Sequence, residues 1–96
     1  MTIKILFCVE ITLNIPLDSD PTKMDAIKRA EKERAIELQK AGKWPHLWRV
    51  TGKYSNISIF DVESNNELHD LLMSLPLFPY MEIKVTALSQ HPSSIH

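Results

Sequence analysis

The order in which two hydrophobic repeats follow one another limits the fold of this chain more than any other feature. Apolar residues alternate with a period of two, which is typical of strands, over 3–13, 46–51, 54–62 and 81–87. They recur every 3.6 residues, as on one face of an amphipathic helix, over 18–42 and 64–75. The sequence therefore predicts the element order β-α-β-β-α-β.

This order is typical of the ferredoxin-like, or split βαβ, arrangement. We expect an α+β fold in which an antiparallel four-stranded sheet carries two helices on one face. The other face of the sheet is not polar, since Leu6 and Cys8 share it with Glu10 and Thr12 in the first strand. Such a face is too apolar for water, so we expect subunits to associate through their sheets, as in a dimeric αβ-barrel.

Length and charge narrow the class of protein. Ninety-six residues predict one domain, 1–96, with an extended tail over 88–96. The net charge of −1 argues against a nucleic-acid partner. No segment is apolar enough to span a membrane, and Lys4 and Glu10 interrupt the first apolar run, which is therefore no signal peptide. The single cysteine, Cys8, excludes an internal disulfide and predicts a cytoplasmic protein; a small buried or interface residue is a better interpretation of it than a nucleophile.

The helix predicted over 18–42 has one charged residue in the middle of its apolar face. Asp20 is a suitable N-cap, Pro21 suits the first helical position, and Gly42 is a typical stop. The apolar stripe consists of Met24, Ile27, Ala35 and Leu38. At about 100° per residue, Glu31 falls within that stripe.

A carboxylate that faces a core is costly unless it is paired or used in chemistry. Burial also raises its pKa toward the range in which it exchanges protons near neutral pH. Glu31 is therefore the candidate base for a proton transfer. The alternatives are that Glu31 lies at the helix edge, or that it forms a plain buried ion pair with Arg49 or Lys28.

Three further side chains complete a possible proton-transfer site. Arg49, on a strand predicted to be half-buried, is suited to binding a substrate carboxylate, or else forms an ion pair or lies at a solvated edge. Tyr54 is suited to donating a hydrogen bond to a carbonyl, although an aromatic cap on the core is the commoner role. His69, beside the apolar stripe of the second helix, is a candidate catalytic group or a partly buried helix histidine.

The remaining aromatic and histidine residues give weaker signals. His46 lies between Trp44 and Trp48 in the sequence and is placed to line the mouth of a pocket, although tryptophans are more typical of a core. The four histidines lack the spacing of metal ligands, and two isolated glycines cannot form a phosphate-binding loop. We therefore expect neither a metal nor a cofactor.

Local signals set the boundaries of the second half of the chain. Gly52-Lys53 marks the turn of a hairpin between the second and third strands. Ser64 and Glu67 have the spacing of a capping box, in which each side chain accepts a hydrogen bond from the other residue's backbone N–H. The helix that they start ends before Pro76.

Several stretches resemble a known family over nearly the whole chain. The longest are GKWPHLWRVTGKYSNISIFDV (Gly42 to Val62), ELHDLLMSLPLFPYMEIKV (Glu67 to Val85) and HPSSI (His91 to Ile95). Asp20-Pro21, Glu31-Lys32 and FCVEITLNIP (7–16) extend the likeness toward the N-terminus. Together they resemble the muconolactone Δ-isomerase family. Pro45 is a local departure, because arginine is usual there in the family.

The resemblance implies a ferredoxin-like subunit that pairs through its sheet and assembles into a homo-oligomer, a decamer in the family. It also implies a small-molecule lactone substrate and a reaction, the conversion of muconolactone to 3-oxoadipate enol-lactone in the β-ketoadipate pathway of aromatic catabolism. A base removes the proton at C4, and the resulting dienolate is protonated at C2. One carboxylate shielded from water can perform both steps.

The reaction suggests roles for the candidate residues. Glu31 is the proton shuttle, Arg49 or Lys32 binds the substrate carboxylate, and Tyr54 or His69 donates to the lactone carbonyl. His46 and Trp48 are predicted to contact the substrate as well.

Three other functions are alternatives, and the sequence does not separate the first of them from the isomerase. A chloromuconolactone dehalogenase of the same fold would begin with a similar deprotonation and then lose chloride. A non-enzymatic ferredoxin-like module would bind a ligand or serve assembly. A heme-degrading or quinone-oxidising dimeric αβ-barrel would need a histidine ligand that is not evident in this sequence.

Overall fold

The computed structural model describes residues 4–96 of the chain. In chain order the elements are β1 (Ile5–Leu13), α1 (Pro21–Lys40), β2 (His46–Arg49), β3 (Ser55–Val62), α2 (Asn65–Met73), the 3₁₀ turn η1 (Phe78–Tyr80) and β4 (Met81–Leu88). This order confirms the predicted β-α-β-β-α-β arrangement. The first strand is predicted to begin at residue 3, which lies outside the described residues.

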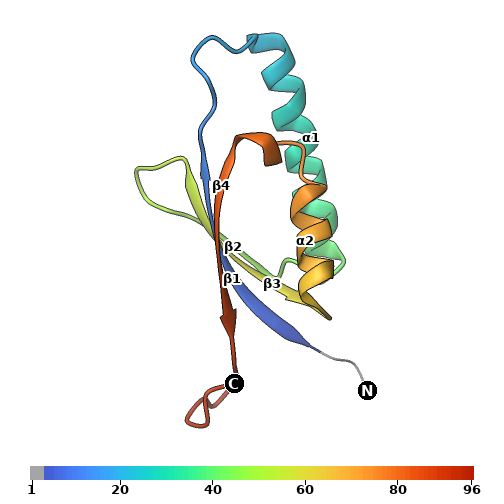
Figure 1. The fold of residues 1–96 in the computed structure, drawn as a ribbon, viewed down its shortest axis with the longest axis vertical. Coiled ribbons are helices and arrows are strands. Elements are labelled where there is room, and N and C mark those ends of the chain that lie inside the picture. The colour runs from blue at the N-terminus through green and yellow to red at the C-terminus, as the bar shows by residue number, and fades with distance from the viewer. Residues whose placement is uncertain (1–3) are drawn as a thin grey trace.

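The four strands form one antiparallel sheet in the order β2-β3-β1-β4. In its middle, Val9 of β1 lies opposite Ser58 of β3 and Val85 of β4. Figure 1 shows both helices on the same side of this sheet. The predicted ferredoxin-like α+β fold is confirmed. Within residues 4–96, none of the helices has the length and apolar character needed to cross a membrane.

The hydrophobic core fills the space between the sheet and the helices. Its buried members are Phe7, Val9, Ile11, Ala35, Leu38, Trp44, Phe60, Val62, Leu68, Leu72 and Leu75. The ring of Trp44 stacks on Phe60, with centroids 4.7 Å apart. Trp48 is 55% exposed, so a core position holds for only one of the two tryptophans.

Both ends of α1 form as the sequence predicts. The carboxylate of Asp20 accepts hydrogen bonds from the backbone N–H groups of Thr22 and Lys23, at 2.9 and 3.3 Å. At the other end Gly42 has a φ of 77°, and its N–H and that of Lys43 return to carbonyls of the last turn. This is a Schellman motif, and the positive φ is the reason for glycine at this position.

The start of α2 departs from the predicted capping box. Ser64 accepts the N–H of Glu67 at 3.0 Å, as predicted. The carboxylate of Glu67, however, accepts the N–H of Glu63 rather than that of Ser64, and it also pairs with Lys43 at 3.1 Å. The reciprocal half of the box is therefore wrong, because a cation from the α1–β2 connection draws the carboxylate toward it.

The second strand is shorter and more exposed than predicted. β2 ends at Arg49 rather than Thr51, because a turn begins at Val50, where Lys53 N–H donates to the Val50 carbonyl at 3.1 Å. Gly52, with a φ of 81°, is the third residue of that turn. All four β2 side chains are exposed, so the prediction that Arg49 lies on a half-buried strand is wrong. The reason is that β2 is an edge strand, paired with β3 alone.

The sheet face away from the helices is partly apolar. Leu6 and Cys8 of β1 and Ile57 and Ile59 of β3 are only partly buried there, next to the exposed Trp48. We call this surface the open face. Cys8 is partly buried on this face, and its place in an interface stays a prediction.

Candidate active site

Glu31 lies midway along α1 and faces the segment that follows α2. Its Oε1 accepts a hydrogen bond from the backbone N–H of Leu77 at 2.9 Å. Desolvation of the half-buried carboxyl raises its pKa above the ordinary value, and the hydrogen bond from Leu77 lowers the pKa in part. Among residues 4–96 the ion pairs do not include Glu31, so the alternative of a buried pair with Arg49 or Lys28 is wrong.

Arg49 and Tyr54 lie together at a second feature, a cavity of about 360 Å³. Its lining consists of Leu13, Leu47, Arg49, Tyr54, Ser55 and Asn56. The hydroxyl of Ser58 donates to Oδ1 of Asn56 at 2.7 Å, which orients this amide. Both candidate side chains are open to solvent in the single subunit, and Tyr54 is 76% exposed. A guanidinium, a phenol and an amide at one cavity can bind a small anion that also carries a carbonyl.

Glu31 and this cavity lie at the same end of the sheet. In an antiparallel sheet, the end of β1 at Leu13 meets the start of β3 and the start of β4. The N–H of Leu13 donates to the Tyr54 carbonyl at 2.9 Å, and that of Asn14 donates to the Tyr80 carbonyl at 2.8 Å. These bonds join the hairpin turn to the segment that contains Leu77. Figure 1 shows the segment between α2 and β4 beside α1, whereas the β2–β3 hairpin turn projects from the other side of the strands.

His69 occupies the opposite end of the sheet. It lines a cavity of about 490 Å³ together with Phe7, Asn65, Asn66, Leu68, Leu72, Val85 and Ala87. The prediction of a partly buried His69 is wrong, because the buried stripe of α2 passes through Leu68 and Leu72 and leaves His69 exposed. His69 is therefore separated from both Glu31 and Tyr54.

Two of the other predicted contacts, His46 and Trp48, lie on β2, and the third, Lys32, follows Glu31 on α1. His46 and Trp48 stack with ring centroids 5.1 Å apart, and both are exposed. Because side chains alternate along a strand, this pair faces away from the side of β2 that presents Leu47 and Arg49 to the cavity. Lys32 is exposed on α1. Among residues 4–96, the His, Cys, Asp and Glu side chains form no cluster suited to a metal ion.

Two parts of this arrangement were missed by sequence reasoning. The donor to Glu31 is a backbone N–H, which has no signature in the sequence. Asn56 was detectable, because two polar residues, Asn56 and Ser58, occupy the face of β3 that continues with Phe60 in the core. Polar residues on a core-facing stripe are a signal for a polar cavity wall.

Comparison with known proteins decides the family. The family model for muconolactone Δ-isomerase matches residues 5–94. This chain belongs to the muconolactone Δ-isomerase family. The resemblance identified from the sequence is thereby confirmed.

Individual members of the family match over nearly their full length. The muconolactone Δ-isomerase of Acinetobacter baylyi is 54% identical over 90 residues, which cover 94% of both chains. Muconolactone Δ-isomerase 1 of Acinetobacter lwoffii is 58% identical over the same share of both chains, and the Pseudomonas putida enzyme is 54% identical over 95% of both. A crystal structure of muconolactone isomerase superposes with a TM-score of 0.90 at 56% identity, covering 95% of each chain.

Proposed function

We propose that this protein is an isomerase that converts muconolactone to 3-oxoadipate enol-lactone, and that Glu31 moves the proton. The observation that carries the proposal is the full-length match to relatives named muconolactone Δ-isomerase, at 52–58% identity over 94–95% of the chain. The β-ketoadipate pathway of aromatic catabolism is consistent with that name. The half-buried carboxyl of Glu31 supports the assignment of the shuttle.

The isomerisation requires one group that first accepts and then returns a proton. The C4–H bond of the lactone breaks, its electron pair enters the conjugated dienolate, and the proton goes to the Glu31 carboxylate. The same carboxyl then protonates C2, so that atoms and electrons balance without a redox partner or a cofactor. A raised pKa suits Glu31 to this task, because a carboxylate with a higher pKa is a stronger base toward the C4 proton.

Arg49 and Tyr54 have the donors that such a substrate needs. The guanidinium of Arg49 binds the acetate arm through paired hydrogen bonds, and the Tyr54 hydroxyl donates to the lactone oxygen on which negative charge develops. The cavity of about 360 Å³ is in the range of small-molecule sites, which begins at roughly 300 Å³. Lys32 and His69 are the weaker alternatives for these roles, because Lys32 is exposed and His69 lies at the other end of the sheet.

An oligomer is part of the same proposal. The open face carries the partly buried Leu6, Ile57 and Ile59 beside the exposed Trp48, which favours pairing of two subunits through their sheets. A decamer built from such dimers is the assembly that the family resemblance implies. The lone Cys8 fits the reducing cytoplasm that we propose as the location.

The test is to incubate the purified protein with muconolactone and, separately, with its chlorinated analogue, following enol-lactone and chloride. We expect rapid enol-lactone formation from muconolactone. Preferential release of chloride from the analogue would instead support the dehalogenase. Binding of either lactone without turnover would support a ligand-binding module and contradict the proposal.

A further inference from the structure

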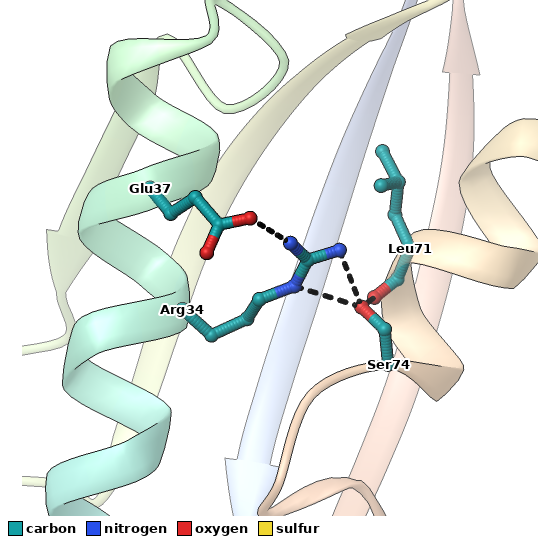
Figure 2. A network of polar contacts seen from close by, with 4 residues as sticks. All are labelled: Arg34, Glu37, Leu71 and Ser74. Carbon is teal, nitrogen blue, oxygen red and sulfur yellow. Dashed lines mark hydrogen bonds and ion pairs between the residues drawn. The ribbon is translucent and has the colours of Figure 1, made fainter.

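The segment 74–77, which joins α2 to η1, is held to α1 at two points. One is the bond from Leu77 N–H to Glu31. The other is Arg34, whose Nε and Nη2 both donate to the hydroxyl oxygen of Ser74 at 3.1 Å (Figure 2). Glu31 and Arg34 are three residues apart on α1, and so are Ser74 and Leu77. Residues at this spacing share a helix face, so one face of α1 holds both ends of the segment.

Arg34 also places its positive charge beside the C-terminal end of α2. Ser74 is the C-cap of α2, and its hydroxyl donates to the carbonyl of Leu71 at 2.6 Å. The last turn of α2 has no basic residue of its own. A helix C-terminus carries partial negative charge, and the guanidinium of Arg34 provides the complementary charge from the neighbouring helix. Figure 2 shows the guanidinium between the two helices, with its third nitrogen on Glu37.

The chain between the two points has little freedom. The side chains of Leu75 and Leu77 are 2% and 4% exposed, so they are fixed in the core. The Leu77 carbonyl also accepts the N–H of Tyr80 at 2.9 Å in η1. Because the segment has little freedom, a displacement of Ser74 would be transmitted to the Leu77 N–H.

We infer that Arg34 is a positioning residue, which holds Ser74 and thereby keeps the Leu77 N–H on the carboxylate of Glu31. The effect of Arg34 on catalysis rests on the proposed role of Glu31 as the proton shuttle, whereas its effect on the Leu77–Glu31 hydrogen bond does not. Arg34 needs no contact with substrate for this role.

Loss of the Arg34–Ser74 contact should change the protonation of Glu31. The Leu77 bond lowers the pKa of a carboxyl that burial raises, so a looser bond leaves the pKa higher still. The charged groups one turn from Glu31 on α1 are Lys28 and Arg34, and the titratable side chain in 74–80 is Tyr80. The β1 residues that face the helices are apolar. Removing the positive charge of Arg34 would by itself also raise the pKa of Glu31. A second variant must therefore break the contact and leave that charge in place.

The experiment compares Arg34→Ala and Ser74→Ala, the second of which keeps the guanidinium. Both positions are at the surface or partly exposed, so both variants should fold. The ¹³C NMR titration of the Glu31 carboxyl and hydrogen exchange of the Leu77 amide are measured, together with the pH profile of kcat/KM. We expect the pKa of Glu31 to rise by about half a unit or more, the Leu77 amide to exchange at least about tenfold faster, and the acid limb of the profile to move to higher pH.

The matched control is Lys43→Ala. It breaks the Lys43–Glu67 ion pair of 3.1 Å, which ties the α1–β2 connection to the first turn of α2 rather than to its end. A merely structural effect of loosening α2 would move all three readouts in this control too, and that result would overturn the inference. Unchanged titration and exchange in Ser74→Ala would also overturn it. If the Glu31 titration and the Leu77 exchange both shift but the wild-type protein does not isomerise muconolactone, the role of Arg34 is supported and the proposed function is contradicted.

Discussion

The two ends of the sheet carry cavities that differ in chemistry. At the end where β1 finishes, a cavity of about 360 Å³ is lined by Arg49 and Tyr54, and the carboxyl of Glu31 is held at the same end by Leu77. At the end where β1 begins, a larger cavity of about 490 Å³ is lined mainly by apolar side chains, with His69 as its titratable group. Volume alone would therefore select the His69 end.

The burial of the titratable groups instead favours the end of the sheet that carries Glu31. A general base works best when it is shielded from water and its pKa lies near the working pH. Glu31 is half-buried and has a raised pKa, whereas His69 is exposed on α2. A cationic side chain that can hold an anionic substrate is also found at the Glu31 end. Desolvation and complementary charge thus favour the Glu31 end as the proposed site, whereas cavity size favours the His69 end.

The largest expected effect compares Glu31→Gln with His69→Gln. Glutamine can still accept the Leu77 N–H but cannot take a proton, so we expect isomerisation by Glu31→Gln to fall by about a hundredfold or more. His69→Gln should retain activity within about twofold. Initial rates with muconolactone, with folding and assembly checked on both variants, measure this. The reverse pattern would move the base to the His69 end.

A smaller effect is expected from substitutions of Arg49. If its guanidinium binds the acetate arm, Arg49→Ala should raise KM by about tenfold or more while kcat changes less. Arg49→Lys should fall between the two, because an ammonium keeps the charge but loses the paired hydrogen bonds. Full kinetics at several substrate concentrations separate the two parameters. An unchanged KM in Arg49→Ala would remove the substrate-binding role from this end of the sheet.

The smallest effect concerns stability as a function of pH. The pKa of Glu31 is higher in the folded chain than its ordinary value of 4.5, so the unfolded chain loses this proton first as pH rises. The wild type should therefore lose stability relative to Glu31→Gln as pH rises from about 4.5 through the folded pKa. Urea unfolding of both proteins across this window tests the sign. A wild type that gains stability relative to the variant over the same window would contradict the raised pKa.

Most of the fold could be predicted because its signals are local. Alternation and the 3.6-residue repeat gave the order of elements, and Asp20, Pro21 and Gly42 gave the ends of α1. The exposure of β2 could not be predicted in this way, because alternation along a strand does not say whether it lies at an edge. The ion pair of Glu67 with Lys43 could not be predicted either, because the two residues are 24 positions apart and only the folded chain brings them close.

The candidate site was predictable in part for the same reason. Glu31 stood out because a charge interrupts an apolar stripe, and that signal needs nothing beyond its own helix. The sequence did not predict that His69, His46 and Trp48 lie away from Glu31. Residue type does not say which end or face of a sheet a side chain reaches. The contact between Arg34 and Ser74, 40 residues apart, has no local signal at all.

The unequal environments of the two tryptophans give the protein two built-in optical reporters. Trp44 is sealed in the core against Phe60, so its emission follows the integrity of packing between the sheet and α1. Trp48 lies on the open face beside His46, so its emission and its accessibility to a dissolved quencher follow whatever covers that face. Unfolding and a change in the cover of the open face can thus be observed separately in one unlabelled sample, with Trp48→Phe to assign the signals.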